Sequence, residues 1–189
     1  MRSRLAMLTI AVSCAFAGNA MALTKTEYST QKDQIKAEYK ANRDKCSAMK
    51  ANAKDVCVAE AKGTEKIAKA ELESKYKPNA KNTRDVAMAK ADSAYTVAKE
   101  KCDDLAGNAK DVCVKDAKAA HVKAKEDAKV AKVSMDSSAN KTEKVNEAKK
   151  EANAETREAN YKAARERCDS LAGNAKDACQ KDAKVKFGM

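Results

Sequence analysis

One twelve-residue stretch occurs three times in this chain, and each copy begins and ends with a cysteine. The copies cover residues 46–57, 102–113 and 168–179. Each ends in Asn-Ala-Lys-Asp-x-Cys, and six residues separate each first cysteine from a tyrosine: Tyr39, Tyr95 and Tyr161. A frame that recurs with its cysteines in register indicates three copies of one local structure. The repeat therefore constrains the fold more than any other feature of the sequence.

The residues around each copy predict an antiparallel pair of helices. They are rich in Ala, Lys, Glu and Arg, which favour helix. Gly107 and Gly173 suit the left-handed position that ends a helix. Asn108 and Asn174 are good N-cap residues, and an aspartate follows three positions later, where a carboxylate complements the helix dipole. Each copy is thus predicted to form helix, two-residue turn and helix, which is a helical hairpin.

The predicted hairpin places the two cysteines of each copy equally far from its turn. Antiparallel helices in close contact bring such a pair within the Cα separation of a disulfide. The threefold repetition favours these local pairings over the other connectivities that six cysteines allow. The predicted disulfides join Cys46 to Cys57, Cys102 to Cys113 and Cys168 to Cys179.

The predicted fold is all-α, with three antiparallel helical hairpins in series. Helices are expected over residues 24–50, 52–77, 83–106, 109–133, 143–172 and 175–187. The hairpins are then residues 23–77, 83–133 and 143–189. Pro78, the only proline, and the polar stretch 134–142 separate them. Because the first cysteines lie 56 and then 66 residues apart, the hairpins are expected to pack loosely or to be partly independent rather than to form a strict solenoid.

The expected core is thin. The chain has no Trp and two Phe, and alanine dominates the predicted helix faces, where it allows close approach but buries little apolar area. Each disulfide is expected to add about 3 kcal/mol of stability. The repeated tyrosines allow two interpretations, a ladder of binding side chains or rings that fill gaps opposite small residues, and packing is favoured. Gly63 is expected to weaken its helix locally.

The first 22 residues have the order of a secretory signal peptide. Arg2 and Arg4 precede an apolar run over residues 5–16, and an Ala-Met-Ala sequence ends at Ala22, the predicted cleavage point. The apolar run is too short to be a transmembrane anchor. The six later cysteines are even in number, as in an oxidising compartment. A periplasmic protein of a Gram-negative bacterium is predicted, with a lipoprotein processed at Cys14 as the minor alternative.

Catalytic and metal-binding patterns are not recognisable. His121 is the only histidine, so a histidine-based triad would have to include it. Its expected level opposite Tyr95 favours surface packing. Zinc sites use closer cysteine pairs, usually with histidines, and thioredoxin-like chemistry uses Cys-x-x-Cys. The sequence therefore predicts no enzyme, no cofactor and no metal, and a metal or redox role for the cysteine pairs is kept as the third hypothesis.

The formal net charge of +11 raises the question of an anionic partner. Basic residues crowd the first hairpin at Lys36, Lys40, Arg43, Lys45, Lys50 and Lys54. The candidate polyanion-binding residues are Lys115, Lys118, Lys123, Lys125, Lys129 and Lys132. The simpler interpretation is that lysines keep an alanine-rich helix soluble. Nucleic acid is not expected, because the chain is predicted to be exported and carries no recognisable nucleic-acid motif.

The Ala/Lys/Glu-rich helical character after an export segment resembles, in composition, the middle domain of TolA, the envelope-spanning helical protein. Small exported proteins of proteobacteria with this composition are often labelled TolA-like. The segment Leu105-Ala-Gly-Asn-Ala-Lys and its copy at Leu171 also resemble the turn of PsiF repeats, small exported proteins with paired cysteines. This chain departs from TolA in lacking a membrane-length anchor and a recognisable C-terminal binding domain.

Three hypotheses on function follow. The first is a non-enzymatic exported scaffold or adaptor of the cell envelope. The second is a module that binds anionic envelope polymers, peptidoglycan or lipopolysaccharide, through lysine-rich helix faces. The third is the metal or redox role of the cysteine pairs.

Overall fold

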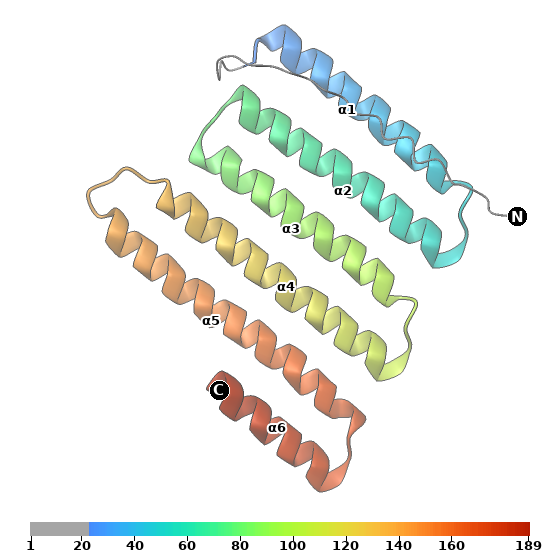
Figure 1. Ribbon diagram of the computed structural model, residues 1–189, viewed down its shortest axis with the longest axis vertical. Helices are drawn as coiled ribbons and strands as arrows, with labels where there is room; N and C mark the ends of the chain where they lie inside the picture. Colours follow the sequence, from blue (N-terminus) through green and yellow to red (C-terminus); the bar gives the residue numbers. More distant parts are fainter. Residues whose placement is uncertain (1–22) are drawn as a thin grey trace, which may run out of the picture.

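In the part of the chain that the structure describes, six α-helices lie side by side in one layer, and each runs antiparallel to the next (Figure 1). The computed structural model describes residues 23–189. The helices are α1 (Lys25–Cys46), α2 (Ala51–Tyr76), α3 (Ala80–Cys102), α4 (Gly107–Ser134), α5 (Lys141–Arg167) and α6 (Gly173–Phe187), and a 3-10 turn, Cys168–Ser170, follows α5. The all-α prediction and its three hairpins are confirmed. The predicted signal peptide, with Cys14, lies outside the described residues.

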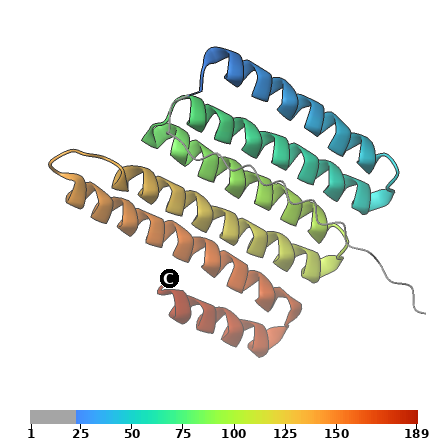
Figure 2. The same ribbon diagram turned by 45° about the horizontal axis from the view of Figure 1, so that its top comes forward.

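The layer is continuous, because its extensive contacts join helices that are consecutive in the chain. The contacts of α2 with α3 and of α4 with α5 link neighbouring hairpins, and they are more extensive than those within any hairpin. Figure 2, a view turned by 45°, shows the same single layer. The expectation of loosely packed hairpins is therefore wrong. The changed spacing of the repeats is absorbed in helix and joint lengths, not in a break of the packing.

Small side chains form the seams between the helices. Among residues 23–189, nine of the thirteen buried apolar residues are alanines, and Leu72 is the only large one. Alanine lets helix backbones approach closely but removes little apolar surface from water, so each seam is weak per residue. The three largest fully buried side chains are Cys46, Cys102 and Cys168. The disulfides are thus part of the core as well as cross-links.

Gly63 has a packing role that the sequence did not reveal. It is buried in α2, and a Cβ built on it would lie 2.9 Å from Cβ of Ser93 in α3. Ser93 is also buried, and its hydroxyl donates to the backbone oxygen of Ala89 at 2.7 Å. The glycine therefore provides the space in which α2 and α3, helices of different hairpins, meet.

The three cysteine turns lie at one end of the layer (Figure 1). The turn of the second hairpin covers residues 103–106, because α3 ends at Cys102 and α4 begins at Gly107. Gly107 has the predicted left-handed backbone, with φ of 53°, but it starts the second helix and does not end the first. The N-cap is Ala106, not Asn108. The predicted two-residue turn and asparagine caps are therefore wrong, because the register of the helix start was misplaced.

Asn52, the first-hairpin equivalent of Asn108, makes a contact between hairpins instead. Its side-chain amide donates to the backbone oxygen of Glu100, in the last turn of α3, at 2.8 Å. It thereby satisfies one of the carbonyls that a helix end leaves free.

Ala51 holds the left-handed position in the first hairpin, with φ of 48°, where the other two hairpins have glycine. An L-residue with a Cβ is strained in that region. We expect Ala51→Gly to stabilise the chain by about 1 kcal/mol, and Gly107→Ala to destabilise it by about the same amount. Urea unfolding of both variants measures this pair of effects. Changes of the same sign would contradict the assignment of strain to Ala51.

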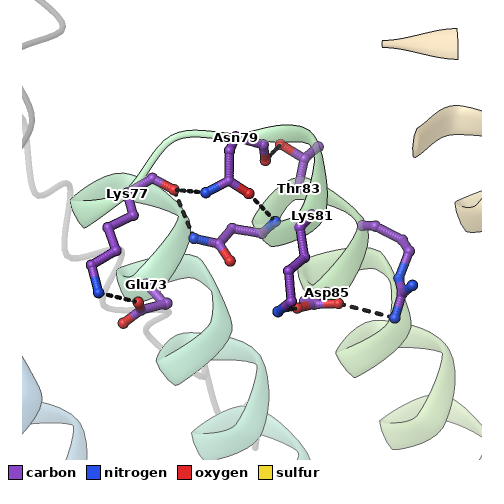
Figure 3. A network of polar contacts seen from close by, with 8 residues as sticks. Glu73, Lys77, Asn79, Lys81, Thr83 and Asp85 are labelled. Carbon is purple, nitrogen blue, oxygen red and sulfur yellow. Dashed lines mark hydrogen bonds and ion pairs between the residues drawn. The ribbon is translucent and has the colours of Figure 1, made fainter. Parts of the chain in front are cut away.

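A compact joint connects α2 to α3 (Figure 3), at the end of the layer opposite the cysteine turns (Figure 1). Asn79 caps α3 by accepting from the backbone N–H of Asn82 at 2.8 Å, and the Asn82 side chain donates to the carbonyl of Lys77 at 2.7 Å. Asn82 is buried. The predicted boundary, residues 78–83, is thus a tight turn, and α3 begins three residues earlier than expected because Asn79 supplies the cap.

Asp136 organises the joint between α4 and α5. Its carboxylate accepts from the backbone N–H of Ser138 at 3.0 Å, from Lys144 Nζ at 3.1 Å and from the Ser138 hydroxyl at 3.0 Å. These contacts, with the backbone hydrogen bond as the largest cause, lower the pKa of Asp136 from 3.8 to about 2. The ordered joint explains why α5 begins at Lys141, two residues before its predicted start.

The Asp136 contacts predict a stability loss in acid. A lowered folded-state pKa stabilises the fold above the unfolded value of 3.8, and this stabilisation is lost as the pH falls towards about 2. NMR titration should show the Asp136 carboxylate still ionised at pH 3. The Asp136→Asn variant should lack this part of the pH dependence of unfolding. A normal titration of Asp136 would contradict the joint geometry.

Candidate functional site

The three predicted disulfides are present. The Cα atoms are 5.6 Å apart in Cys46–Cys57, 5.7 Å in Cys102–Cys113 and 5.7 Å in Cys168–Cys179. The first cysteine of each pair ends the outgoing helix or begins the turn, and the second lies near the start of the returning helix. A sulfur in a disulfide is not a thiolate, so metal ligation would need the reduced chain. Thiol–disulfide exchange would instead need an external thiolate to reach one of the disulfide sulfurs.

Compartment and membrane topology are constrained by two observations. Disulfides persist in oxidising compartments, so the three bonds are compatible with an exported location. Over residues 23–189, no helix combines the length and the apolar character needed to cross a bilayer.

A cluster of polar and aromatic side chains joins three helices at the middle of the layer. The rings of Tyr95 in α3 and His121 in α4 stack with centroids 4.6 Å apart and planes 9° apart. His121 Nε2 lies 2.7 Å from Oδ1 of Asp92. Lys66 of α2 donates to the other carboxylate oxygen of Asp92 at 2.7 Å. The cluster, here called the His121 cluster, therefore ties the first hairpin to both helices of the second.

Charge in the His121 cluster centres on Asp92. Partial burial raises the pKa of this carboxyl, but the hydrogen bonds with Lys66 and His121 outweigh it, so the pKa lies below 3.8. The Asp92 carboxylate is an acceptor only, and His121 Nε2 is accordingly its donor. His121 Nδ1 is buried and has no hydrogen-bond partner among the described residues.

The histidine was predicted at the level of Tyr95, and the stacked rings confirm that placement. The prediction of surface packing is wrong, because only 9% of the His121 side chain is exposed. The sequence feature that could have predicted the burial of His121 is Asp92. It lies one helical turn before Tyr95 and therefore on the same side of α3. The arrangement holds helices together through one ion pair, one charge-assisted hydrogen bond and one ring stack.

Five of the six candidate polyanion-binding lysines share one side of α4. They recur at spacings of three, seven, four and three residues: Lys115, Lys118, Lys125, Lys129 and Lys132. Lys123 lies on the other side of the helix, by the same helical spacing. We call the five residues the α4 lysine stripe.

Neighbouring groups engage much of this charge. The ion pairs are Lys115 with Glu166 at 3.6 Å, Lys123 with Asp127 at 2.6 Å and Lys129 with Glu126 at 2.6 Å. Lys118 Nζ lies 5.5 Å from the centroid of the Tyr95 ring. The α4 lysine stripe is thus arranged along a surface, but part of its charge is already balanced within the layer.

Comparison of this chain with protein-family models, with curated proteins and with solved structures finds no match.

Proposed function

We propose that this chain is a non-enzymatic helical scaffold of the bacterial cell envelope, exported to the periplasm after cleavage behind Ala22. The observation that carries the proposal is a single layer of helices cross-linked by three disulfides. In a layer of this kind, each inner helix uses two sides for its neighbours and leaves two sides to solvent. Helical arrays present extended binding surfaces in this way.

The chemistry of the layer fits a scaffold better than an enzyme. The buried polar groups of the His121 cluster bind one another across three helices, and the carboxylates along the helices alternate with lysines that pair with them. The disulfides supply rigidity to seams made of alanine. The compositional resemblance to the TolA middle domain supports the same assignment to the envelope.

A gene deletion in the bacterium of origin tests the scaffold. We expect the deletion to increase leakage of periplasmic proteins and sensitivity to detergent, because a structural component of the envelope is lost. The full chain should restore the envelope, whereas a chain without residues 1–22 should not. An unchanged envelope, or rescue by the chain that stays in the cytoplasm, would count against the proposal.

The α4 lysine stripe supports a second candidate, the binding of anionic envelope polymers. Five lysines along one side of a helix match the extended charge of peptidoglycan or lipopolysaccharide better than a compact ligand. Cosedimentation with each polymer should weaken as salt is raised, because salt screens exposed charges. Replacing the five lysines by glutamine should abolish the binding, while Lys123→Gln serves as the matched control. Binding that ignores both salt and the five substitutions excludes this candidate.

A further inference from the structure

The first hairpin carries a basic hollow, and its two lysines lack the ion pairs that equivalent lysines of the other hairpins form. It has a volume of about 390 Å³ and lies beside the Cys46–Cys57 disulfide. Its lining includes Tyr39, Lys40, Arg43 and Asp44 of α1 and Lys54 of α2. We call it the Tyr39 hollow. It lies outside the α4 lysine stripe and does not depend on the scaffold proposal.

The cations of the Tyr39 hollow outnumber its carboxylates. Among the described residues, none of Lys40, Arg43 and Lys54 forms an ion pair, and Asp44 is the one carboxylate in the lining. The equivalents of Lys54 are engaged: Lys110 pairs with Asp103 at 3.0 Å, and Lys176 pairs with Asp169 at 2.9 Å. Comparison of the three repeats therefore shows that the first hairpin lacks the ion pair of this lysine.

A single replacement explains the free Lys54. The position of Asp103 and Asp169 is taken in the first hairpin by Ser47. The Ser47 hydroxyl donates to the backbone oxygen of Asp44 at 2.6 Å and so caps its own helix end. Without this aspartate, Lys54 lines the Tyr39 hollow and lacks the partner that Lys110 and Lys176 have.

A second replacement explains the free Lys40. In the third hairpin the equivalent Lys162 pairs with Glu158, four residues earlier, at 2.6 Å. In the first hairpin the residue four positions before Lys40 is Lys36, which itself pairs with Asp33 at 2.9 Å. The segment 36–54 has six basic and two acidic residues. The equivalent segment 92–110 has three basic and four acidic residues, and 158–176 has four basic and three acidic residues.

We propose that the Tyr39 hollow is a binding site for a small phosphate monoester. Arginine presents a planar fork of donors that matches phosphate oxygens, and lysines add point charges, so Arg43 with Lys40 and Lys54 can hold the dianion. Three cations against one carboxylate leave the hollow positive enough for such a ligand. The Tyr39 ring provides a face for the sugar or other ring that carries the phosphate. The volume lies in the range of small-molecule sites.

Titration calorimetry on the disulfide-bonded chain tests the site, with glucose 6-phosphate as probe and glucose as the uncharged reference. Glucose 6-phosphate should bind and glucose should not. Ser47→Asp restores the carboxylate that both other hairpins carry, so the variant should fold, bind Lys54 and weaken the affinity at least about tenfold. The matched control Ser47→Asn has the same shape without the charge and should keep the affinity within about twofold.

A second arm distinguishes the source of the phosphate. Vesicles of phosphatidylcholine with phosphatidic acid present the same monoester on a lipid. Binding to these vesicles alone, again weakened by Ser47→Asp, would assign the site to a lipid headgroup. Absence of binding to both probes, or equal binding by wild type and Ser47→Asp, overturns the proposal. Loss of binding on substitution of the α4 lysine stripe, with Ser47→Asp unaffected, would also overturn it by placing the anion elsewhere.

Discussion

Reduction of the three disulfides is expected to unfold this chain at room temperature. Each bond closes a loop with a sequence separation of 11 residues, and the loop-entropy model gives about 3 kcal/mol for such a bond. Three bonds together contribute about 9 kcal/mol on this model, which is comparable to the whole stability of a typical domain. The alanine seams bury too little apolar area to compensate. Circular dichroism should show loss of helix on addition of a reductant.

Removal of a single disulfide should destabilise the chain to an extent that depends on where that disulfide lies in the layer. Helix α6 packs against α5 and its 3-10 turn, so replacing Cys168 and Cys179 by serine should release α6 while α2 to α5 stay folded. Replacement of Cys102 and Cys113 by serine removes a cross-link between the central helices α3 and α4, and it should lower the stability of all helices together. Amide hydrogen exchange distinguishes the two patterns. Full retention of helix in the reduced chain would show that the seams alone hold the layer.

Replacement of Gly63 by leucine should open the seam between the first and second hairpins. A Cβ alone would lie 2.9 Å from Ser93 Cβ, and a leucine side chain has no space at that point. We expect a loss of about 3 kcal/mol in unfolding free energy, the upper part of the usual range for an overfilled core. Urea unfolding and hydrogen exchange in α2 and α3 measure the effect.

Thr64 offers the matched control, since it is the next residue of α2 and is exposed. Thr64→Leu adds a similar side chain to the same helix and should change stability by no more than about 0.5 kcal/mol. A second control is the double variant Gly63→Ala/Ser93→Gly. It adds a Cβ to α2 and removes the facing Cβ from α3, so it should be more stable than Gly63→Ala alone. Equal costs for Gly63→Leu and Thr64→Leu would show that α2 and α3 do not meet at Gly63.

Sequence reasoning predicted the hairpins and the disulfides because both depend on local spacing. A cysteine that recurs on either side of a turn signal can be placed on facing helices without any knowledge of the rest of the chain. The positive φ at Gly107 and Gly173 was predicted for the same reason. The helix starts were misplaced because Ala, Lys and Glu favour helix on both sides of each boundary, so helix propensity does not indicate where a helix begins.

Packing between hairpins could not be predicted from this sequence. Alanine lines the seams within a hairpin and between hairpins alike. Buried Ala89 lies one turn before Ser93, which meets Gly63 of α2. Buried Ala91 lies one turn before Tyr95, which stacks on His121 of α4. The contact of Gly63 with Ser93 and the contact of Asp92 with His121 each join residues of different helices, and neither partner identifies the other by spacing. An isolated glycine inside a helical pattern was the available signal, and its meaning was close approach rather than weakness.

The most direct test of the stapled, exported layer is the intact mass of the protein recovered from the periplasm, before and after reduction and thiol alkylation. The chain is expected to begin at Leu23 and to take up no alkylating reagent until it is reduced, when six cysteines should react. Peptide mapping should then join Cys46 to Cys57, Cys102 to Cys113 and Cys168 to Cys179. Free thiols in the recovered protein, other pairings, or a chain that keeps residues 1–22 would contradict the stapled scaffold.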